Sequence, residues 1–427
     1  MTGILLVALT LQAVGPAAAD TMQQVTLAEA LQRAAQLDPN YVAALNRIGD
    51  AEWANRAATL AFVTPFLDVS TSATKFSSDF FNIGTGGLSS RQLDARIEAG
   101  YDLFAGLSKV YESKRARAAL EQAKANELEA RFQTALLTET EYYDVITLRE
   151  LAEVSSERVS RARQQLQIAR ARVLAGGAVQ TDTLQLLLEL NRARVELLRD
   201  EAALKVAREQ LGRRIGLAAA VDAGPSSDLP APPLPISEQE AAEEAILNSP
   251  RALATRAAEK AANAAVKVAR AEYFPAIDVF GQWTAFDDSF FPDATTRALY
   301  GLRVSFPIWD RGQRELNNQR ARTERNIASS VRSDTELAVR LEAIRAYEGY
   351  NTARAAAEIE REAVLVAQEN LRVQSERYKT GATTILDLLT AQIELSEAEA
   401  GLVAARQVER LALASLEALL GRRLFYG

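Results

Sequence analysis

The sequence contains no cysteine and no histidine among its 427 residues, and it has only two methionines. These absences exclude disulfides, Cys and His nucleophiles, and most zinc and copper sites. The net charge of −7 provides no basic field for a nucleic-acid backbone, so we expect no nucleic-acid partner. We also expect no cofactor, no metal and no enzymatic activity, because a hydrolase without His or Cys needs paired carboxylates in a cleft.

Long apolar runs are missing after the first twenty residues. No later stretch approaches the ~18 consecutive apolar residues of a transmembrane helix. The beginning differs, because an apolar run from Ile4 to Val14 precedes the small residues Ala17 to Ala19. This pattern predicts a secretory signal peptide over residues 1–19, with a buried N-terminal helix as the alternative. We therefore expect an exported chain without a helical anchor.

A glycine turn followed by an aspartate occurs twice. The stretch "RVLAGGAVQTDTL" begins at Arg172, and "RYKTGATTILDLL" begins at Arg377. Further matches at the same spacing indicate an internal repeat, with copies at 20–216 and 236–427. Residues 217–235 contain five prolines and are expected to form an extended linker between the copies.

Each copy is expected to contain the same elements in the same order. A first helix precedes a Pro and two strands, then a very long helix runs to the glycine turn, and a shorter helix returns. The long helices contain no Pro and would measure about 100 Å, roughly three times a bilayer core. Their apolar residues recur at three-to-four spacing, which is typical of coiled coils. The expected elements are helices 26–61 and 237–272, strand pairs 65–75 with 94–104 and 276–286 with 298–308, long helices 108–174 and 313–379, and return helices 181–213 and 384–420.

Two of the expected strands alternate strictly. In "RIEAGYDL" the apolar residues alternate with Arg96, Glu98 and Asp102, and in "YGLRVSF" they alternate with Arg303. One face of such a strand lies in apolar surroundings and the other contacts water, as in a soluble sandwich or in a membrane barrel with a polar lumen. These four charged residues would line the lumen of a barrel, or lie on a solvated face of a sandwich. Four strands are too few to close a barrel, so several chains would have to share one.

The order of elements resembles the TolC family of outer-membrane efflux proteins. The resemblance covers most of the chain and depends on the duplicated G-x5-D turns, on "PFLDV" and "PAIDV", and on "YDLFAGLSK" and "FPIWDRGQR". It implies a mostly α fold with a small β part, in which a helical coiled-coil barrel continues into a 12-stranded transmembrane barrel of a homotrimer. The implied location is the outer membrane of a Gram-negative bacterium, in contact with its lipid, with the tunnel in the periplasm. The implied function is a passive exit duct of a tripartite efflux pump or type I secretion system.

The resemblance also implies partners and site residues. The partners would be a periplasmic membrane-fusion adaptor and an inner-membrane efflux pump or ABC transporter. Asp387 would contribute to a ring of three carboxylates at the closed periplasmic gate, and Asp182 would pair with Tyr378. The family's prototype has an arginine at the position of Thr383 and a second aspartate at that of Thr390, so this gate lacks both groups. The adaptor would dock at the tip residues Arg172, Gly176, Gly177, Arg377 and Gly381.

Simpler roles remain open for the tip residues. An aspartate in the first turn of a helix satisfies free N–H groups and suits the helix dipole, so Asp182 and Asp387 could be capping residues. The glycines could serve only to reverse the chain at a helix end. For the whole chain, the alternative to a duct is a non-channel periplasmic coiled-coil scaffold or adaptor.

Overall fold

The structure, a computed structural model, describes residues 22–83, 86–224, 232–289 and 294–425. The expected signal peptide 1–19 and the middle of the expected linker lie outside these residues. The chain divides into two compact units, and each combines segments of both sequence repeats. The elements in chain order are β1 (Gln24–Val25), α1 (Leu27–Leu37), α2 (Pro39–Leu60), β2 (Phe66–Asn82), β3 (Gly87–Ala105), α3 (Ser108–Leu174), α4 (Gln180–Arg214), β4 (Asp222–Ala223), α5 (Glu238–Asn248), α6 (Pro250–Ala271), β5 (Ala276–Asp287), β6 (Thr295–Ser305), α7 (Gln313–Thr380) and α8 (Ile385–Leu420).

Among the described residues, the first unit comprises 22–37, 137–224 and 353–411, and it contains α4 and most of α8. A short parallel ladder joins β1 to β4. Asp222 of β4 accepts hydrogen bonds from Arg149 of α3 at 3.2 Å and from Arg208 of α4 at 2.9 Å. These contacts attach the chain that follows α4 to the side of the α3–α4 hairpin. The core beside the ladder consists of Val25, Ala30, Tyr142, Val145, Ile146, Leu204, Ala207, Leu211, Ile215, Val221 and Ala223.

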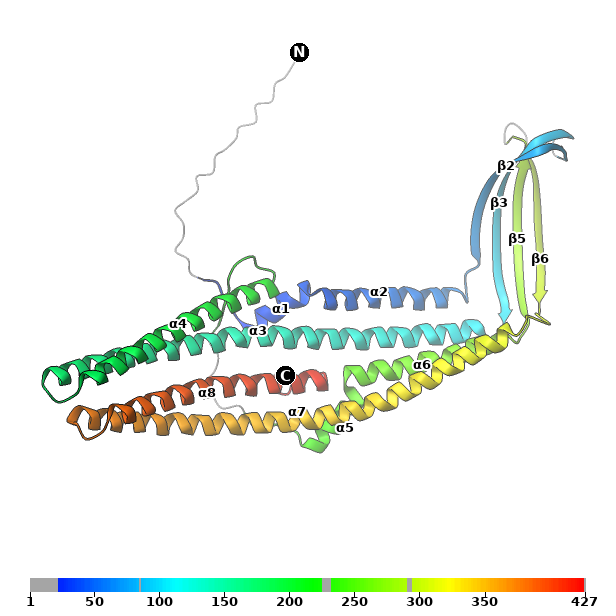
Figure 1. The fold of residues 1–427 in the computed structure, drawn as a ribbon. Helices are drawn as coiled ribbons and strands as arrows, with labels where there is room; N and C mark the ends of the chain where they lie inside the picture. Colours follow the sequence, from blue (N-terminus) through cyan, green and yellow to red (C-terminus); the bar gives the residue numbers. More distant parts are fainter. Residues whose placement is uncertain (1–21, 84–85, 225–231, 290–293, 426–427) are drawn as a thin grey trace, which may run out of the picture. The chain divides into compact units, whose positions relative to one another are not determined.

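The second unit comprises residues 38–136, 232–352 and 412–427 and contains the sheet. Its four strands are antiparallel in the order β2-β3-β5-β6, so β2 and β6 are the two edges (Figure 1). The helical part has a small core of Ala245, Val339, Ala343, Leu416 and Leu420. Nearby, the hydroxyl of Tyr350 donates to the carbonyl of Pro232 at 2.8 Å.

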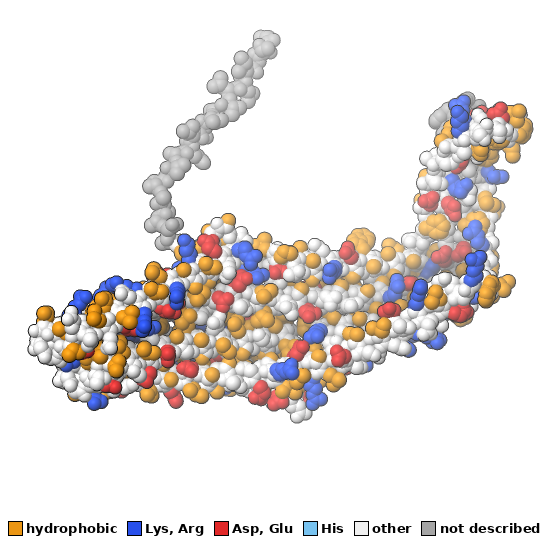
Figure 2. Space-filling view, in the orientation of Figure 1, with side chains coloured by type: hydrophobic (Ala, Val, Ile, Leu, Met, Phe, Trp, Pro, Cys, Tyr) orange, Lys and Arg blue, Asp and Glu red, His pale blue; other side chains and the backbone are white. Residues whose placement is uncertain are grey.

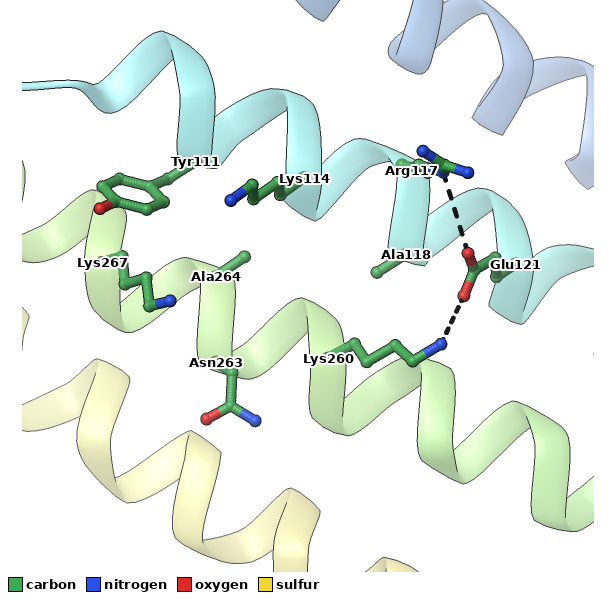
Figure 3. A pocket seen from close by; sticks show the side chains of 9 residues that line it. All are labelled: Tyr111, Lys114, Arg117, Ala118, Glu121, Lys260, Asn263, Ala264 and Lys267. Atoms are coloured by element: carbon green, nitrogen blue, oxygen red, sulfur yellow. Dashed lines mark hydrogen bonds and ion pairs between the residues drawn. The ribbon is translucent and has the colours of Figure 1, made fainter.

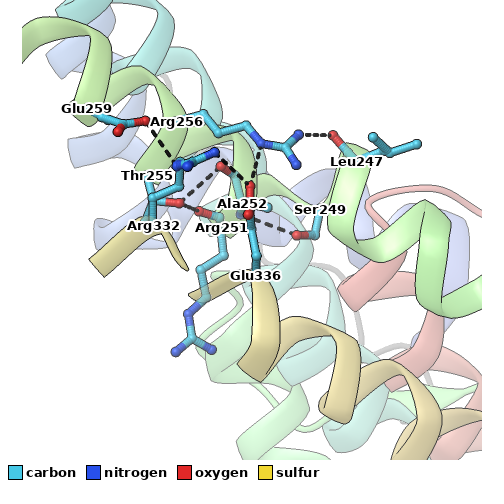
Figure 4. A network of polar contacts seen from close by, with 9 residues as sticks. All are labelled: Leu247, Ser249, Arg251, Ala252, Thr255, Arg256, Glu259, Arg332 and Glu336. Carbon is cyan, nitrogen blue, oxygen red and sulfur yellow. Dashed lines mark hydrogen bonds and ion pairs between the residues drawn. The ribbon is translucent and has the colours of Figure 1, made fainter. Parts of the chain in front are cut away.

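A network of ion pairs holds α6 against α7 in the second unit (Figure 4). Arg256 of α6 lies 3.0 Å from Glu336 of α7 and also donates to the carbonyl of Leu247. Arg332 of α7 lies 3.0 Å from Glu259 of α6. Elsewhere the helical surface carries charges of both signs, interspersed with apolar side chains (Figure 2).

The expected first helix of each copy is in fact two helices. Pro39 begins α2 and Pro250 begins α6, because proline lacks an N–H and is accepted only in the first turn. Asp38 caps α2 by accepting from the amides of Asn40 and Tyr41, and Ser249 caps α6 through the amide of Ala252. The single helices predicted over 26–61 and 237–272 were therefore wrong.

The first strand pair is longer than predicted. Strands β2 and β3 extend beyond the expected 65–75 and 94–104, and the segment between these ranges continues the ladder through Phe80↔Ser89 and Phe81↔Leu88. A register shift between Lys75 and Phe80 accommodates the change. The last strand begins three residues earlier than predicted and ends at Ser305 instead of 308.

The sheet has one polar and one apolar face. Residues paired across an antiparallel ladder point to the same face. Arg96 pairs with Ser70 and Thr284, and Glu98 pairs with Asp68 and Gln282. The other face carries the apolar side chains Leu67, Val69, Ile97, Val279, Trp283, Tyr300, Leu302 and Val304. All eight of these side chains are exposed, which is unusual for a face of this size.

Both passages from strand to long helix contain two successive residues with positive φ. These are Gly106 and Leu107 before α3, and Arg311 and Gly312 before α7. A Cβ on Gly106 would lie 2.3 Å from the carbonyl oxygen of Ala271, so this glycine allows a close approach of two backbone segments. The same left-handed turn therefore connects sheet and helix in both sequence repeats.

Candidate functional site

The two glycine turns have the same backbone structure. In the first, the amide of Gly177 donates to the carbonyl of Arg172 and that of Gly176 to the carbonyl of Val173; the second repeats these bonds at the equivalent residues. This pattern is a Schellman motif, in which the residue after the helix adopts a left-handed conformation. Gly176 and Gly381 have φ of 73° and 80°, as the turn requires, whereas Gly177 does not have a positive φ. The backbone therefore requires glycine at Gly176 but not at Gly177, whose place in the docking surface stays a prediction.

The α3–α4 and α7–α8 hairpins meet at a buried tyrosine near these turns. Tyr378, in the last turn of α7, is 1% exposed and packs in a core formed by all four helices. Its hydroxyl donates to Asp182 of α4 at 3.3 Å. Arg172 of α3 lies over the Tyr378 ring at 4.5 Å and donates to the Tyr378 carbonyl. The structure thus brings Asp182 and Tyr378 together as the resemblance implied, and it adds Arg172 to the pair.

Burial and charge favour the protonated form of this tyrosine. Burial raises the Tyr378 pKa above its usual value, and the negative charge of Asp182 raises it further, while Arg172 partly opposes the shift. At neutral pH the hydroxyl therefore remains a donor to Asp182. The second guanidinium nitrogen of Arg172 donates to the carbonyl of Gly177 at 2.6 Å, so one side chain connects both hairpins and one turn.

Asp387 is the equivalent of Asp182 in the second copy, but its contacts are local. Its carboxylate accepts from the amide of Thr384 at 3.1 Å, and the Asp387 amide donates to the Thr384 hydroxyl at 3.3 Å. This reciprocal pair is a capping box at the start of α8. The hydroxyl of Thr383 also donates to the Asp387 carboxylate, at 2.8 Å. Hydrogen bonds from Thr384 and then Thr383 lower the pKa of the Asp387 carboxyl.

The capping role expected for both aspartates therefore holds only for Asp387. The position equivalent to Thr384 is Val179, whose side chain has no hydrogen-bonding group. The start of α4 therefore has no side-chain cap. With no reciprocal partner at Val179, Asp182 is directed to Tyr378 instead. A difference of one residue thus separates a helix cap from a contact between hairpins.

The remaining tip residues are closer to solvent. Arg377 and Thr390 are exposed, and Arg377 donates to the carbonyl of Ala382 at 3.3 Å, as Arg172 does to that of Gly177. The hydroxyl of Thr383 also contacts the Gln374 side chain at 3.2 Å. Gly381 lies close to Arg172, because a Cβ on it would be 3.3 Å from a guanidinium nitrogen.

Polar pairs hold the helices together behind the tip. Arg161 of α3 lies 2.7 Å from Glu399 of α8, and Arg158 lies 2.6 Å from Glu189 of α4. Glu189 and Glu399 are largely buried, so these pairs contribute more to register than exposed pairs do. The α3–α4 hairpin is therefore linked to α8 as well as to α7.

The four charged residues predicted for a lumen lie together on the polar face of the sheet. Asp102 and Arg303 both pair with Asp278, and the Arg303 guanidinium lies 4.8 Å from the Phe280 ring. Arg96 and Glu98 continue the same face along β3. The alternation in the sequence therefore placed all four on one face, and their role as a lumen lining stays a prediction.

Two contributions at the tip were not predicted from the sequence. The difference between Val179 and Thr384 was visible in the aligned copies and could have separated the two aspartates. The link from Arg172 to Tyr378 was not visible, because it joins residues from different copies through tertiary packing.

Neither a membrane-spanning helix nor a metal-ligand cluster occurs among the described residues. Within the described ranges, no helix combines the length and apolar composition needed to cross a bilayer. The same residues contain no group of three or more acidic, His or Cys side chains placed to hold a metal ion.

Comparison with known proteins assigns most of the chain to one family model. The model described as "Outer membrane efflux protein" matches residues 27–217 and 241–422. A curated relative, outer membrane efflux protein BepC of Brucella suis biovar 1 (strain 1330), is 27% identical over 274 residues. That match covers 62% of this chain, which spans only 58% of the length of the relative.

Solved structures of similar fold cover nearly the whole chain. The outer membrane protein VceC of Vibrio cholerae superposes with a TM-score of 0.78 at 18% identity, covering 93% of this chain and 96% of VceC. CusC, described as forming a transmembrane channel, superposes with a TM-score of 0.80 at 16% identity, covering 94% of this chain and 93% of CusC. At these identities the similarity shows the fold, in which long helices are joined to a small sheet.

Proposed function

Because the chain belongs to the outer membrane efflux protein family, we propose that three copies form a channel in the outer membrane. The channel is the passive exit duct of a tripartite efflux pump or type I secretion system. A periplasmic membrane-fusion adaptor and an inner-membrane efflux pump or ABC transporter deliver the cargo, and the pump supplies the energy. The duct itself needs no cofactor.

The observation that carries this proposal is the two-faced sheet. Its exposed apolar face suits contact with lipid, and the charged face with Arg96, Glu98, Asp102 and Arg303 suits a water-filled lumen. The edges β2 and β6 have no partner strand in the chain as described. Open edges are too costly in a bilayer, so β6 of one copy must pair with β2 of the next. Three copies then supply 12 strands, which is sufficient for a closed barrel.

An exposed apolar stripe on α7 supports the same assembly. Ile327, Val331, Leu337 and Leu341 recur at helical spacing and remain exposed in one chain. They suit packing against the helices of a neighbouring copy, as coiled-coil positions do. The helices of three copies then enclose a periplasmic tunnel that continues from the barrel.

The tip is the proposed periplasmic gate. Tyr378, Asp182 and Arg172 hold the two hairpins of one chain together, so separating the hairpins requires breaking these contacts. Asp387 is exposed beside this latch and contributes one carboxylate of the proposed ring of three. The turns with Gly176 and Gly381 and the exposed Arg377 are the proposed adaptor-docking surface.

Current recordings in planar lipid bilayers test this function. Protein extracted from outer membranes is expected to insert and conduct ions, with a small conductance at rest because the tip is closed. The matched control is the same preparation after heat denaturation, which abolishes the channel. A protein that is recovered only from the soluble fraction and never conducts would contradict the proposal.

A further inference from the structure

A groove between α3 and α6 carries an excess of positive charge (Figure 3). Its volume is about 300 Å³, and its lining includes Lys114 and Arg117 of α3 and Lys260 and Lys267 of α6. Glu121 is the only carboxylate among the lining residues. The groove therefore has a net charge of +3 in a chain whose total is −7.

The carboxylate neutralises only one side of the groove. Glu121 lies 3.0 Å from Lys260 and 4.0 Å from Arg117. At the other side, the ammonium groups of Lys114 and Lys267 lie 5.8 and 5.5 Å from the centre of the Tyr111 ring. Among the described residues, neither of these two lysines forms an ion pair. Two cations thus converge on one aromatic ring without an acidic partner, an arrangement suited to an anion.

The two lysines lie at the same level relative to the end of the sheet. Ala105 and Ala276 are register partners at the end of the β3–β5 ladder. Lys114 follows Ala105 by nine residues, and Lys267 precedes Ala276 by nine. Both lysines therefore lie within nine residues of the sheet along the chain, in the helical turns nearest to it. Because side chains lean toward the N-terminus of their helix, Lys114 leans toward the sheet and Lys267 leans away from it, so the two side chains approach each other (Figure 3).

We propose that this groove binds the phosphate of an anionic phospholipid in the periplasmic leaflet of the outer membrane. The inference rests on the proposed function, because it takes the sheet as the membrane-spanning part. Beyond the hydrocarbon, each leaflet continues for about 5–7 Å as headgroups, and a lysine stem can extend its ammonium group several ångströms toward them. Tyr111, with its apolar ring and polar hydroxyl, is typical of the same interfacial layer.

Native mass spectrometry of the full chain, purified from outer membranes in mild detergent, tests the proposal with added phosphatidylglycerol and phosphatidylcholine. Each lysine near an anionic headgroup contributes about fivefold in affinity. Lys114→Gln with Lys267→Gln is therefore expected to weaken phosphatidylglycerol binding about 25-fold and to leave phosphatidylcholine binding unchanged. Glu121→Gln, which removes the opposing carboxylate, is expected to tighten phosphatidylglycerol binding. The matched control is Lys124→Gln with Lys205→Gln, which removes the same charge from exposed helix positions outside the groove.

Three outcomes would overturn the lipid assignment. One is equal loss of phosphatidylglycerol in the groove and control variants, which would indicate a general charge effect. Another is unchanged binding in all variants. The third is displacement of the lipid by inorganic phosphate at equal concentration, which would assign the groove to a free phosphate anion. A chain that never enters the membrane fraction would instead refute the proposed function, so the two failures are distinguishable.

Discussion

At the scale of single residues, Tyr378 is the point where the two hairpins depend on each other. Its ring is covered by Arg172 and its hydroxyl reaches Asp182, so the latch combines apolar packing, a cation–π contact and a hydrogen bond to a carboxylate. Here Arg172, before the first turn, provides the cation at this contact.

Replacing Tyr378 by Phe is expected to loosen the tip while keeping the ring. The lost hydrogen bond is long and partly accessible to solvent, so we expect the closed state to lose about 1 kcal/mol of stability. This corresponds to roughly a fivefold shift toward the open state. Open probability in planar bilayers measures the effect. The control Tyr350→Phe removes a tyrosine hydrogen bond to Pro232 in the other unit and is expected to leave gating unchanged. An unaltered open probability in Tyr378→Phe would refute the latch.

The pH dependence of the latch follows from the raised pKa of Tyr378. A raised pKa means that the stabilising contribution of the protonated hydroxyl is complete below pH 10, its ordinary pKa, and is lost as pH rises through the higher folded value. Open probability should therefore show an alkaline increase in the wild type, and this increase should be absent in Tyr378→Phe.

The glycine turn offers a matched pair of adjacent positions. Gly176→Ala places a Cβ in a left-handed conformation at a cost of about 1 kcal/mol, whereas Gly177→Ala keeps an ordinary conformation and should be nearly neutral. Faster hydrogen exchange in the last turn of α3 is expected for the first variant only. Equal exchange in the two variants would contradict the assigned turn geometry.

At the scale of elements, the two return helices begin differently. Asp387→Ala removes half of a capping box, so the first turn of α8 should exchange its amide hydrogens faster, while the first turn of α4 should not change. Because the pKa of the Asp387 carboxyl is lowered, its contribution is present above pH 3.8, its ordinary pKa, and is lost as pH falls through the lower folded value. Hydrogen exchange in acid should therefore make the wild type resemble Asp387→Ala at α8. If amide exchange in the first turn of α8 is unchanged in Asp387→Ala, or does not rise in the wild type in acid, the cap is refuted.

At the junction between β3 and α3, replacing a leucine by glycine and a glycine by alanine should change stability in opposite directions. Leu107→Gly relieves a positive φ on an exposed leucine and is expected to be neutral or stabilising by up to about 1 kcal/mol. Gly106→Ala forces a Cβ against the Ala271 carbonyl and should cost more than about 2 kcal/mol. Thermal unfolding in detergent measures both. A stabilised Gly106→Ala protein would contradict the junction geometry.

Elements with strong periodicity were the most predictable from sequence. The long helices were expected at 108–174 and 313–379 and lie at Ser108–Leu174 and Gln313–Thr380, because uninterrupted helix formers end at a glycine. The β2–β3 tip was missed because Ser, Asp and Gly favour loops locally, while ladder hydrogen bonds and a Phe76–Phe80 contact stabilise a strand there. Local composition indicates neither the pairing with β3 nor the packing of these two rings along β2.

At the scale of the whole molecule, a single chain leaves its assembly surfaces exposed. In the proposed assembly, lipid covers the apolar face of the sheet, and neighbouring copies cover the β2 and β6 edges and the apolar stripe on α7. Four strands per chain are fewer than the roughly eight of the smallest closed barrel, so at least two copies are required, and three copies is the number that we propose from the family resemblance.

The mass of the native assembly tests this claim most directly. Native mass spectrometry of protein extracted from outer membranes in mild detergent should show one species of three chains that dissociates on heating. A monomer in the same preparation would contradict a shared barrel, because four strands cannot close one, and a dimer would contradict the proposed number of three copies.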